Sequence, residues 1–211
     1  MSVSYITVGG EGVDEFTESR SRFIGHIKPV TTEAEALEYI AKIKKEYWDA
    51  KHNVYAYVLR NERISRSSDD GEPQGTAGFP VLDVLQKQGL TDCVVVVTRY
   101  FGGILLGTGG LVRAYSKSAS LAVAKAGVLE RRLCAVGTVV CDYSEYGRIQ
   151  PLVIDCGGVI DDTVFSDTVT LTMHFPCESV DVFQTRLTDI SSGRLSFDVL
   201  EEKFFDFLKK V

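Results

Sequence analysis

The stretch CVVVVTRYFGGILLGTGGLVRAYSKSASLAVAKAG, residues 93–127, decides the fold of the first part of the chain. It opens with the β-branched run 93–98, which is typical of a strand buried on both faces. Glycines interrupt the pattern, and residues 109–126 continue as a helix of mostly small side chains that Gly127 ends. The stretch therefore predicts a strand, a glycine-rich turn and a helix.

The residues before this stretch also alternate between strand and helix patterns. Residues 21–30 and 53–60 have strand character. Thr32 and Glu35 form a capping box, so a helix is expected to begin there, and residues 79–88 have the pattern of a second, short helix. This mixture predicts an α+β domain.

The last part of the chain has a more regular order. Periodicity and capping residues assign six elements, which are a strand over 133–141, a helix over 144–156, strands over 159–164 and 168–175, a helix from 179 to 193, and a strand over 195–200. The order βαββαβ is that of a ferredoxin-like domain.

Charge changes along the chain. Residues 1–132 carry 17 Lys and Arg residues against 16 Asp and Glu, whereas residues 133–211 carry 6 against 13. Such a shift in composition is typical of a domain boundary. We therefore predict two domains, residues 1–132 and residues 133–211.

Composition excludes several classes of protein. The 211 residues are 45% apolar and 25% charged, as in a globular chain, and the net charge of −6 excludes a protein coated with positive charge. Because no apolar run is long enough to span a bilayer or act as a signal segment, we expect no membrane association. The five cysteines form no CxxC pair, which favours reduced thiols in the cytoplasm.

Nine of the 19 glycines lie between Gly71 and Gly110, close to several arginines. Free backbone amides at the start of a helix attract anions. Arg113 is expected in the first turn of that helix, where a cation opposes the helix dipole unless an anion joins it. Arg99 closes the preceding strand, so we expect a phosphate cradle formed by Arg99, Gly107, Thr108, Gly109, Gly110 and Arg113.

The same residues have a structural alternative, in which Arg99 pairs within the protein with a nearby acidic loop. That loop consists of Asp69, Asp70, Gly71, Glu72 and Pro73. A nucleotide cofactor is not expected, because GxxxxGK[ST] is absent and the third glycine of a dinucleotide fingerprint is missing. No other cofactor is expected.

The acidic loop and its neighbours leave further alternatives open. Its carboxylates are the ligands that Mg²⁺ prefers, but acidic residues beside glycine also stabilise turns through local hydrogen bonds. His52, after Lys51, has no paired nucleophile in sequence, and Ser67 and Ser68 are expected in a loop. Tyr100 either stacks on an exposed base or joins the core, whereas Phe101 is expected in the core.

Three segments resemble a known family. AKHN at 50–53, SSDDGEPQGTAGFP at 67–80 and VVTRYFGGILLGTGGLVRAY at 96–115 are similar to the IMPACT family, and the remainder resembles the small second domain of its YigZ-like bacterial members. The resemblance implies a first domain with the fold shared by a ribosomal-protein domain and domain IV of elongation factor G, including a left-handed βαβ crossover. It implies a ferredoxin-like second domain.

The first functional hypothesis is a non-catalytic protein that binds RNA or the ribosome in translation or its regulation, with a possible translation-related protein partner. Its expected anion-binding residues are Lys51, His52, Arg99, Tyr100, Gly107, Thr108, Gly109, Gly110 and Arg113. One alternative is a metal-assisted hydrolase of small molecules that uses the acidic loop and His52. The other is a protein-interaction module whose Gly-rich motifs maintain its own fold.

Overall fold

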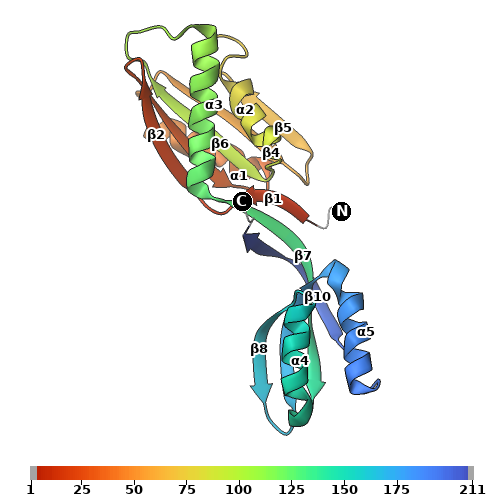
Figure 1. Cartoon of the computed structure of the whole chain (residues 1–211). Coiled ribbons are helices and arrows are strands. Elements are labelled where there is room, and N and C mark those ends of the chain that lie inside the picture. The colour runs from red at the N-terminus through yellow and green to blue at the C-terminus, as the bar shows by residue number, and fades with distance from the viewer. Residues whose placement is uncertain (1–3, 209–211) are drawn as a thin grey trace. The chain divides into compact units, whose positions relative to one another are not determined.

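The computed structural model describes residues 4–208, and its contacts divide the chain into two compact units (Figure 1). The first unit comprises residues 5–130 and the second residues 131–207. The outer ends of the two expected domains, residues 1–3 and 209–211, lie outside the described residues. Both units combine helices with antiparallel sheet, so the α+β class predicted from sequence is confirmed.

A five-stranded antiparallel sheet forms the centre of the first unit. Its strands, in spatial order, are β2 (Gly12–Glu18), β3 (Ser21–Pro29), β6 (Cys93–Tyr100), β4 (His52–Leu59) and β5 (Ile64–Ser68). The short strand β1 (Ser4–Val8) precedes them. The placement of Ser67 and Ser68 in a loop is wrong, because both pair with β4. Strand β5 is an edge strand with largely exposed polar side chains, so it lacks the apolar alternation that marks a strand in sequence.

Helices cover both faces of this sheet (Figure 1). Helix α1 (Glu33–Glu46), which the Thr32 hydroxyl caps as predicted, packs against Val94 and Val96 of β6. On the opposite face, helices α2 (Gly78–Lys87) and α3 (Gly107–Ala126) pack against Val95 and Val97. The β-branched run is therefore the buried central strand that the sequence predicts, with alternate valines in different cores.

Helix α3 lies close to the sheet because glycines face it. A Cβ atom at Gly25 of β3 would lie 2.5 Å from the carbonyl oxygen of Ser118 in α3. Only glycine leaves room for so close an approach of helix and strand backbones. This contact fixes the helix over β2 and β3, with its first turn beside the end of β6.

The second unit has the predicted βαββαβ order. Its elements are β7 (Val128–Cys141), α4 (Tyr143–Asp155), β8 (Val159–Phe165), β9 (Val169–Pro176), the 3-10 turn Cys177–Ser179, α5 (Val180–Ser191) and β10 (Asp198–Leu208). Strand β10 pairs with β7, β7 with β9 and β9 with β8, which is the neighbour order of a ferredoxin-like sheet, and both helices pack on one face. Within residues 4–208, no helix is long and apolar enough to cross a membrane.

Candidate functional site

The register of the first sheet brings three side chains together where β6 ends. Arg99 lies opposite Phe23 of β3 on one side and opposite His52 of β4 on the other. Directly opposed residues point to the same face of a sheet, and Phe23 contacts Tyr115 of α3. Arg99 and His52 therefore both face α3, although they are 47 positions apart along the chain.

Beneath α3, a buried polar cluster surrounds the carboxylate of Glu72. The Arg99 guanidinium and the Tyr115 hydroxyl donate to its Oε1 at 2.5 and 2.8 Å, and His52 Nε2 lies 3.8 Å from the same oxygen. The side chains of Glu72 and Arg99 are each only 5% exposed. Burial, together with the Glu72 charge, raises the pKa of Tyr115, so its hydroxyl stays a donor. We call these four residues the Glu72 cluster.

The structural alternative for Arg99 is thus the arrangement that the molecule adopts. Its second guanidinium nitrogen donates to the Ser21 hydroxyl at 3.3 Å, and the same hydroxyl accepts from the backbone N–H of Gly102 at 3.2 Å. A Cβ atom at Gly102 would overlap with the backbone of Arg20, so the position requires glycine. Arg99 thereby ties the acidic loop to the loop that follows β6.

Asp69 holds the start of helix α2. One of its carboxylate oxygens accepts from the backbone N–H groups of Ala77 and Gly78, at 3.0 and 2.8 Å. The other accepts from the N–H of Gly75 at 2.8 Å. One side chain thus satisfies the Ala77 and Gly78 amides, which the helix itself leaves without acceptors, and the amide of Gly75 just before the helix.

Asp70 is engaged on the other side of the loop. Its two carboxylate oxygens accept from Lys44 Nζ at 2.6 Å and from the backbone N–H of Asn53 at 2.7 Å. Its carbonyl oxygen lies 2.8 Å from His52 Nδ1. Because a carbonyl only accepts, Nδ1 carries the proton, which turns His52 Nε2 toward Glu72.

These contacts do not fit the Mg²⁺ alternative. Asp69 accepts from backbone amides, Asp70 from Lys44 and Asn53, and Glu72 from Arg99 and Tyr115. Across residues 4–208, no group of three or more His, Cys, Asp and Glu side chains is arranged to hold a metal ion. The acidic loop is instead a structural element whose negative charges are matched by donors of the protein.

A hollow of about 430 Å³ opens above the Glu72 cluster, and we call it the Lys51 hollow. It is lined by Lys51, His52, Gly71, Glu72, Pro73, Arg99, Phe101, Leu105, Leu106, Gly107, Thr108 and Leu111. Phe101 is 39% exposed, so its expected place in the core is wrong. Its ring lies 5.2 Å from Lys51 Nζ and 5.4 Å from the Arg99 guanidinium, where the cations hold it at the surface.

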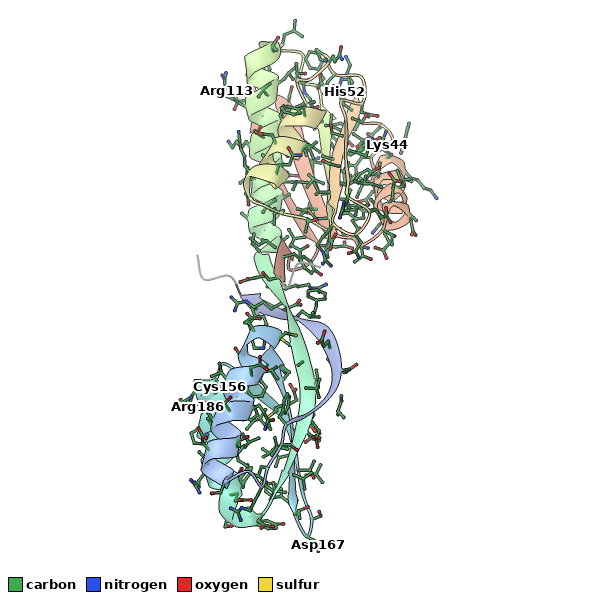
Figure 2. The ribbon with its side chains drawn as sticks, turned by 90° about the vertical axis from the view of Figure 1, so that its right-hand side faces the viewer. Lys44, His52, Arg113, Cys156, Asp167 and Arg186 are labelled. Atoms are coloured by element: carbon green, nitrogen blue, oxygen red, sulfur yellow. The ribbon has the colours of Figure 1, made fainter. Side chains whose placement is uncertain are left out.

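A second hollow of about 390 Å³ adjoins the first, and we call it the Arg113 hollow. It is lined by Phe16, Glu18, Ser19, Leu105, Leu106, Gly110, Arg113, Ala114 and Lys117. Arg113 is the seventh residue of α3, so its expected place in the first turn is wrong, since the helix begins two residues earlier than the sequence indicates. Figure 2 shows Arg113 on the outer side of α3, with His52 near the same end of the unit.

The expected phosphate cradle is therefore divided. Gly107 and Thr108 line the Lys51 hollow with Arg99, whereas Gly110 lines the Arg113 hollow with Arg113. Tyr100 lines neither hollow, and its hydroxyl donates to Asp49 at 2.8 Å. Gly109, Asp69 and Asp70 also line neither one.

Sequence reasoning missed several lining residues. Lys117 is exposed, and its ammonium lies 4.3 Å from the centre of the Phe16 ring. Its spacing of four residues from Arg113 is the signal that places both on one helix face. Leu105 and Leu106 line both hollows, and their only signal is that two large apolar residues stand within a glycine-rich loop.

Comparison with known proteins yields matches over both units. The Impact N-terminal domain family matches residues 19–123, and a domain family of unknown function, DUF1949, matches residues 139–194. The IMPACT family member YvyE of Bacillus subtilis is 42% identical over 90% of this chain and 88% of its own length. YigZ of Escherichia coli, also an IMPACT family member, is 34% identical over 87% of this chain and 91% of its own.

A solved structure is similar over almost the whole chain. It is a crystal structure of a hypothetical protein, 31% identical in sequence, with a TM-score of 0.60. The similarity covers 96% of this chain and 100% of the other. Both units therefore have counterparts in that protein.

Proposed function

This chain belongs to the IMPACT family, and from that premise we propose that it is a non-catalytic RNA-binding protein that acts in translation or its regulation. The observation that carries the proposal is the exposed pair of Lys51 and Phe101 at the rim of the Lys51 hollow. An aromatic ring beside a cation suits an unstacked base and its phosphate, because every base has a face that stacks.

The charges of the hollow support an anionic ligand. At the floor, Arg99 and Glu72 neutralise one another, so neither contributes a free charge. At the rim, Lys51 is exposed and its ammonium faces only the Phe101 ring among its described partners. Beside it, Gly107 and Thr108 begin the 20-residue helix α3, whose first amides have no acceptor within the helix.

Two further observations support RNA of the translation apparatus in the cytoplasm. The family resemblance implies for the first unit the fold shared by a ribosomal-protein domain and domain IV of elongation factor G, which both belong to the translation apparatus. All five cysteines are thiols, as expected for a reducing compartment. We therefore propose the ribosome, or a single-stranded RNA associated with it, as the partner.

The test is fluorescence anisotropy with a labelled single-stranded RNA at several salt concentrations. The variant Lys51→Ala with Phe101→Ala removes both rim groups, and we expect it to lose at least tenfold in affinity, or about 1.4 kcal/mol. Its salt dependence should also fall, by a slope of about 0.7 for each lost phosphate contact.

Lys125→Ala is the matched control, since Lys125 is an exposed lysine in the last turn of the same helix, about 27 Å along α3 from Gly107. It should bind like the wild type. Equal binding by the rim variant would contradict the site, and absence of binding by the wild type would contradict the function. Shortening of the RNA in the presence of Mg²⁺ would contradict the non-catalytic role.

A further inference from the structure

The loop between β6 and α3 presents an apolar ridge, which we define as Ile104 and Leu105. Leu105 is 86% exposed, more than any other large apolar side chain in the described part of the chain, and Ile104 is 43% exposed. Single exposed leucines are common on protein surfaces. This one stands out because it lines two hollows at once and forms the boundary between them.

The ridge is held in place from both ends. Before it, the Gly102 amide donates to the buried Ser21 hydroxyl, and the Gly102 backbone packs directly against that of Arg20. After it, Gly107 takes a positive φ of 68° as it enters α3. The exposure of Leu105 is therefore a consequence of a fixed backbone path, which points the side chain away from the core.

Cations stand on both sides of the ridge. Lys51 lies at the rim of one hollow, and Arg113 and Lys117 lie one helical turn apart in the other. Like charges four residues apart destabilise a helix slightly. Within residues 4–208, Arg113 has no hydrogen-bond or ion-pair partner that offsets this. Arg113 and Lys117 outweigh Glu18, the one carboxylate that lines the second hollow, so both hollows keep a net positive charge. An apolar projection between two such hollows matches a polymer that carries anionic groups on both sides of an apolar stack.

We propose that Leu105 inserts between two neighbouring bases of the RNA and unstacks them, while the phosphates on either side occupy the Lys51 and Arg113 hollows. This inference rests on the proposed RNA binding and specifies its mode. Apolar side chains are known to act as wedges between bases in nucleic acid complexes. Nucleic acid fits better than an anionic membrane surface, because the cations lie in two separate hollows on either side of one projecting side chain, as successive phosphates of a strand would require.

The experiment uses the full chain and a single-stranded RNA that contains 2-aminopurine, whose fluorescence rises when the base unstacks. Anisotropy of a dye at the end of the same RNA reports binding independently. We expect the wild type to increase the 2-aminopurine signal on binding. Leu105→Ala should bind within about tenfold of the wild-type affinity, because the cations remain, but without the fluorescence increase.

Leu37→Ala is the matched control, since Leu37 is a half-exposed leucine on α1, on the opposite face of the sheet, and it should leave both signals unchanged. An unchanged 2-aminopurine increase with Leu105→Ala would overturn the inference. Wild-type binding without any increase in 2-aminopurine fluorescence would also overturn the inference, although the proposed RNA binding would remain supported. Absence of RNA binding by the wild type would overturn both this inference and the proposed function. If the wild type instead cosedimented with vesicles of mixed neutral and anionic lipid and Leu105→Ala did not, the ridge would be a membrane-binding site.

Discussion

The Glu72 cluster and the rim above it draw on the same segments of the sequence but have opposite environments. In the cluster, Glu72 and Arg99 are buried and bonded to one another. At the rim, Lys51 and Arg113 are exposed, and Leu105 projects between them. The two regions adjoin one another, but only in the first would removal of one charged group leave another buried without its partner. The rim is therefore free to serve a ligand.

The difference shows that a charged residue in a Gly-rich motif is not thereby a binding residue. Arg99 and Arg113 look alike in sequence, since each flanks the glycine-rich loop. Strand register buries the first beside Glu72, and helix phase exposes the second. The following predictions test whether this division between folding and binding residues holds.

Arg99→Ala should have the largest effect on stability. Removing one partner of a buried ion pair leaves the Glu72 carboxylate without its main donor, which costs about 3–5 kcal/mol of unfolding free energy. Urea denaturation measures the loss, and Arg113→Ala is the control, expected within about 0.5 kcal/mol of the wild type. If the two alanine variants were equally stable, buried and exposed arginines would not differ as the structure indicates.

His26 tests how burial of a histidine that lacks one hydrogen-bond partner changes the pH dependence of stability. Its side chain is 2% exposed, Nε2 has no hydrogen-bond partner among the described residues, and burial lowers its pKa to about 4 from the usual 6.5. Because the unfolded imidazole binds a proton more tightly than the folded one, stability falls as pH drops below 6.5. The loss reaches about 3 kcal/mol near pH 4.

The measurement is the unfolding free energy at pH 7.5 and pH 4.5. Carboxyl groups also titrate below pH 5, so the wild type is compared with His26→Phe, which keeps a ring beside Tyr47 and cannot be protonated. We expect the variant to lose less stability than the wild type between the two pH values. Identical losses would show that His26 takes up its proton without unfolding.

Asp69→Ala should cost about 2 kcal/mol, because three backbone amides near the start of α2 lose their acceptor. Asp69→Asn keeps one oxygen and should retain part of that stability. Urea denaturation of both variants measures the difference. Asp69 lines neither hollow, so RNA binding of the folded variants should be unchanged. A loss of RNA binding without a loss of stability would show that the acidic loop is part of the binding site.

The sequence predicted the elements that carry strong local signals. The valine run of β6, the capping box at Thr32 and the βαββαβ order of the second unit are each determined by neighbouring residues. Strands β2 and β5 were missed because edge strands bury few side chains and show no apolar alternation. Local patterns also left the first residue of α3 uncertain by two positions, which was enough to misplace Arg113 within the helix.

The candidate site could be predicted only as a set of residues. The sequence brought Lys51, His52, Arg99 and Arg113 into one group, but which of them is buried depends on strand register and helix phase. Phe101 shows the same limit. An aromatic residue beside two glycines suggests a core anchor, and only the neighbouring cations reveal why the ring remains at the surface.

Replacing Lys117 should have the smallest effect on stability, and it distinguishes a binding role of this lysine from a folding role. Its ammonium lies over the Phe16 ring at an exposed site, so Lys117→Met, which keeps the apolar stem, should cost no more than about 0.5–1 kcal/mol. Urea denaturation measures this cost, and anisotropy with single-stranded RNA should show a salt slope lower by about 0.7 if Lys117 holds one phosphate. A small change in stability together with a clear change in salt slope would place Lys117 with the rim. A large loss of stability with an unchanged slope would place it with the folding residues, and the Arg113 hollow would then lack one of the two cations that make it an anion site.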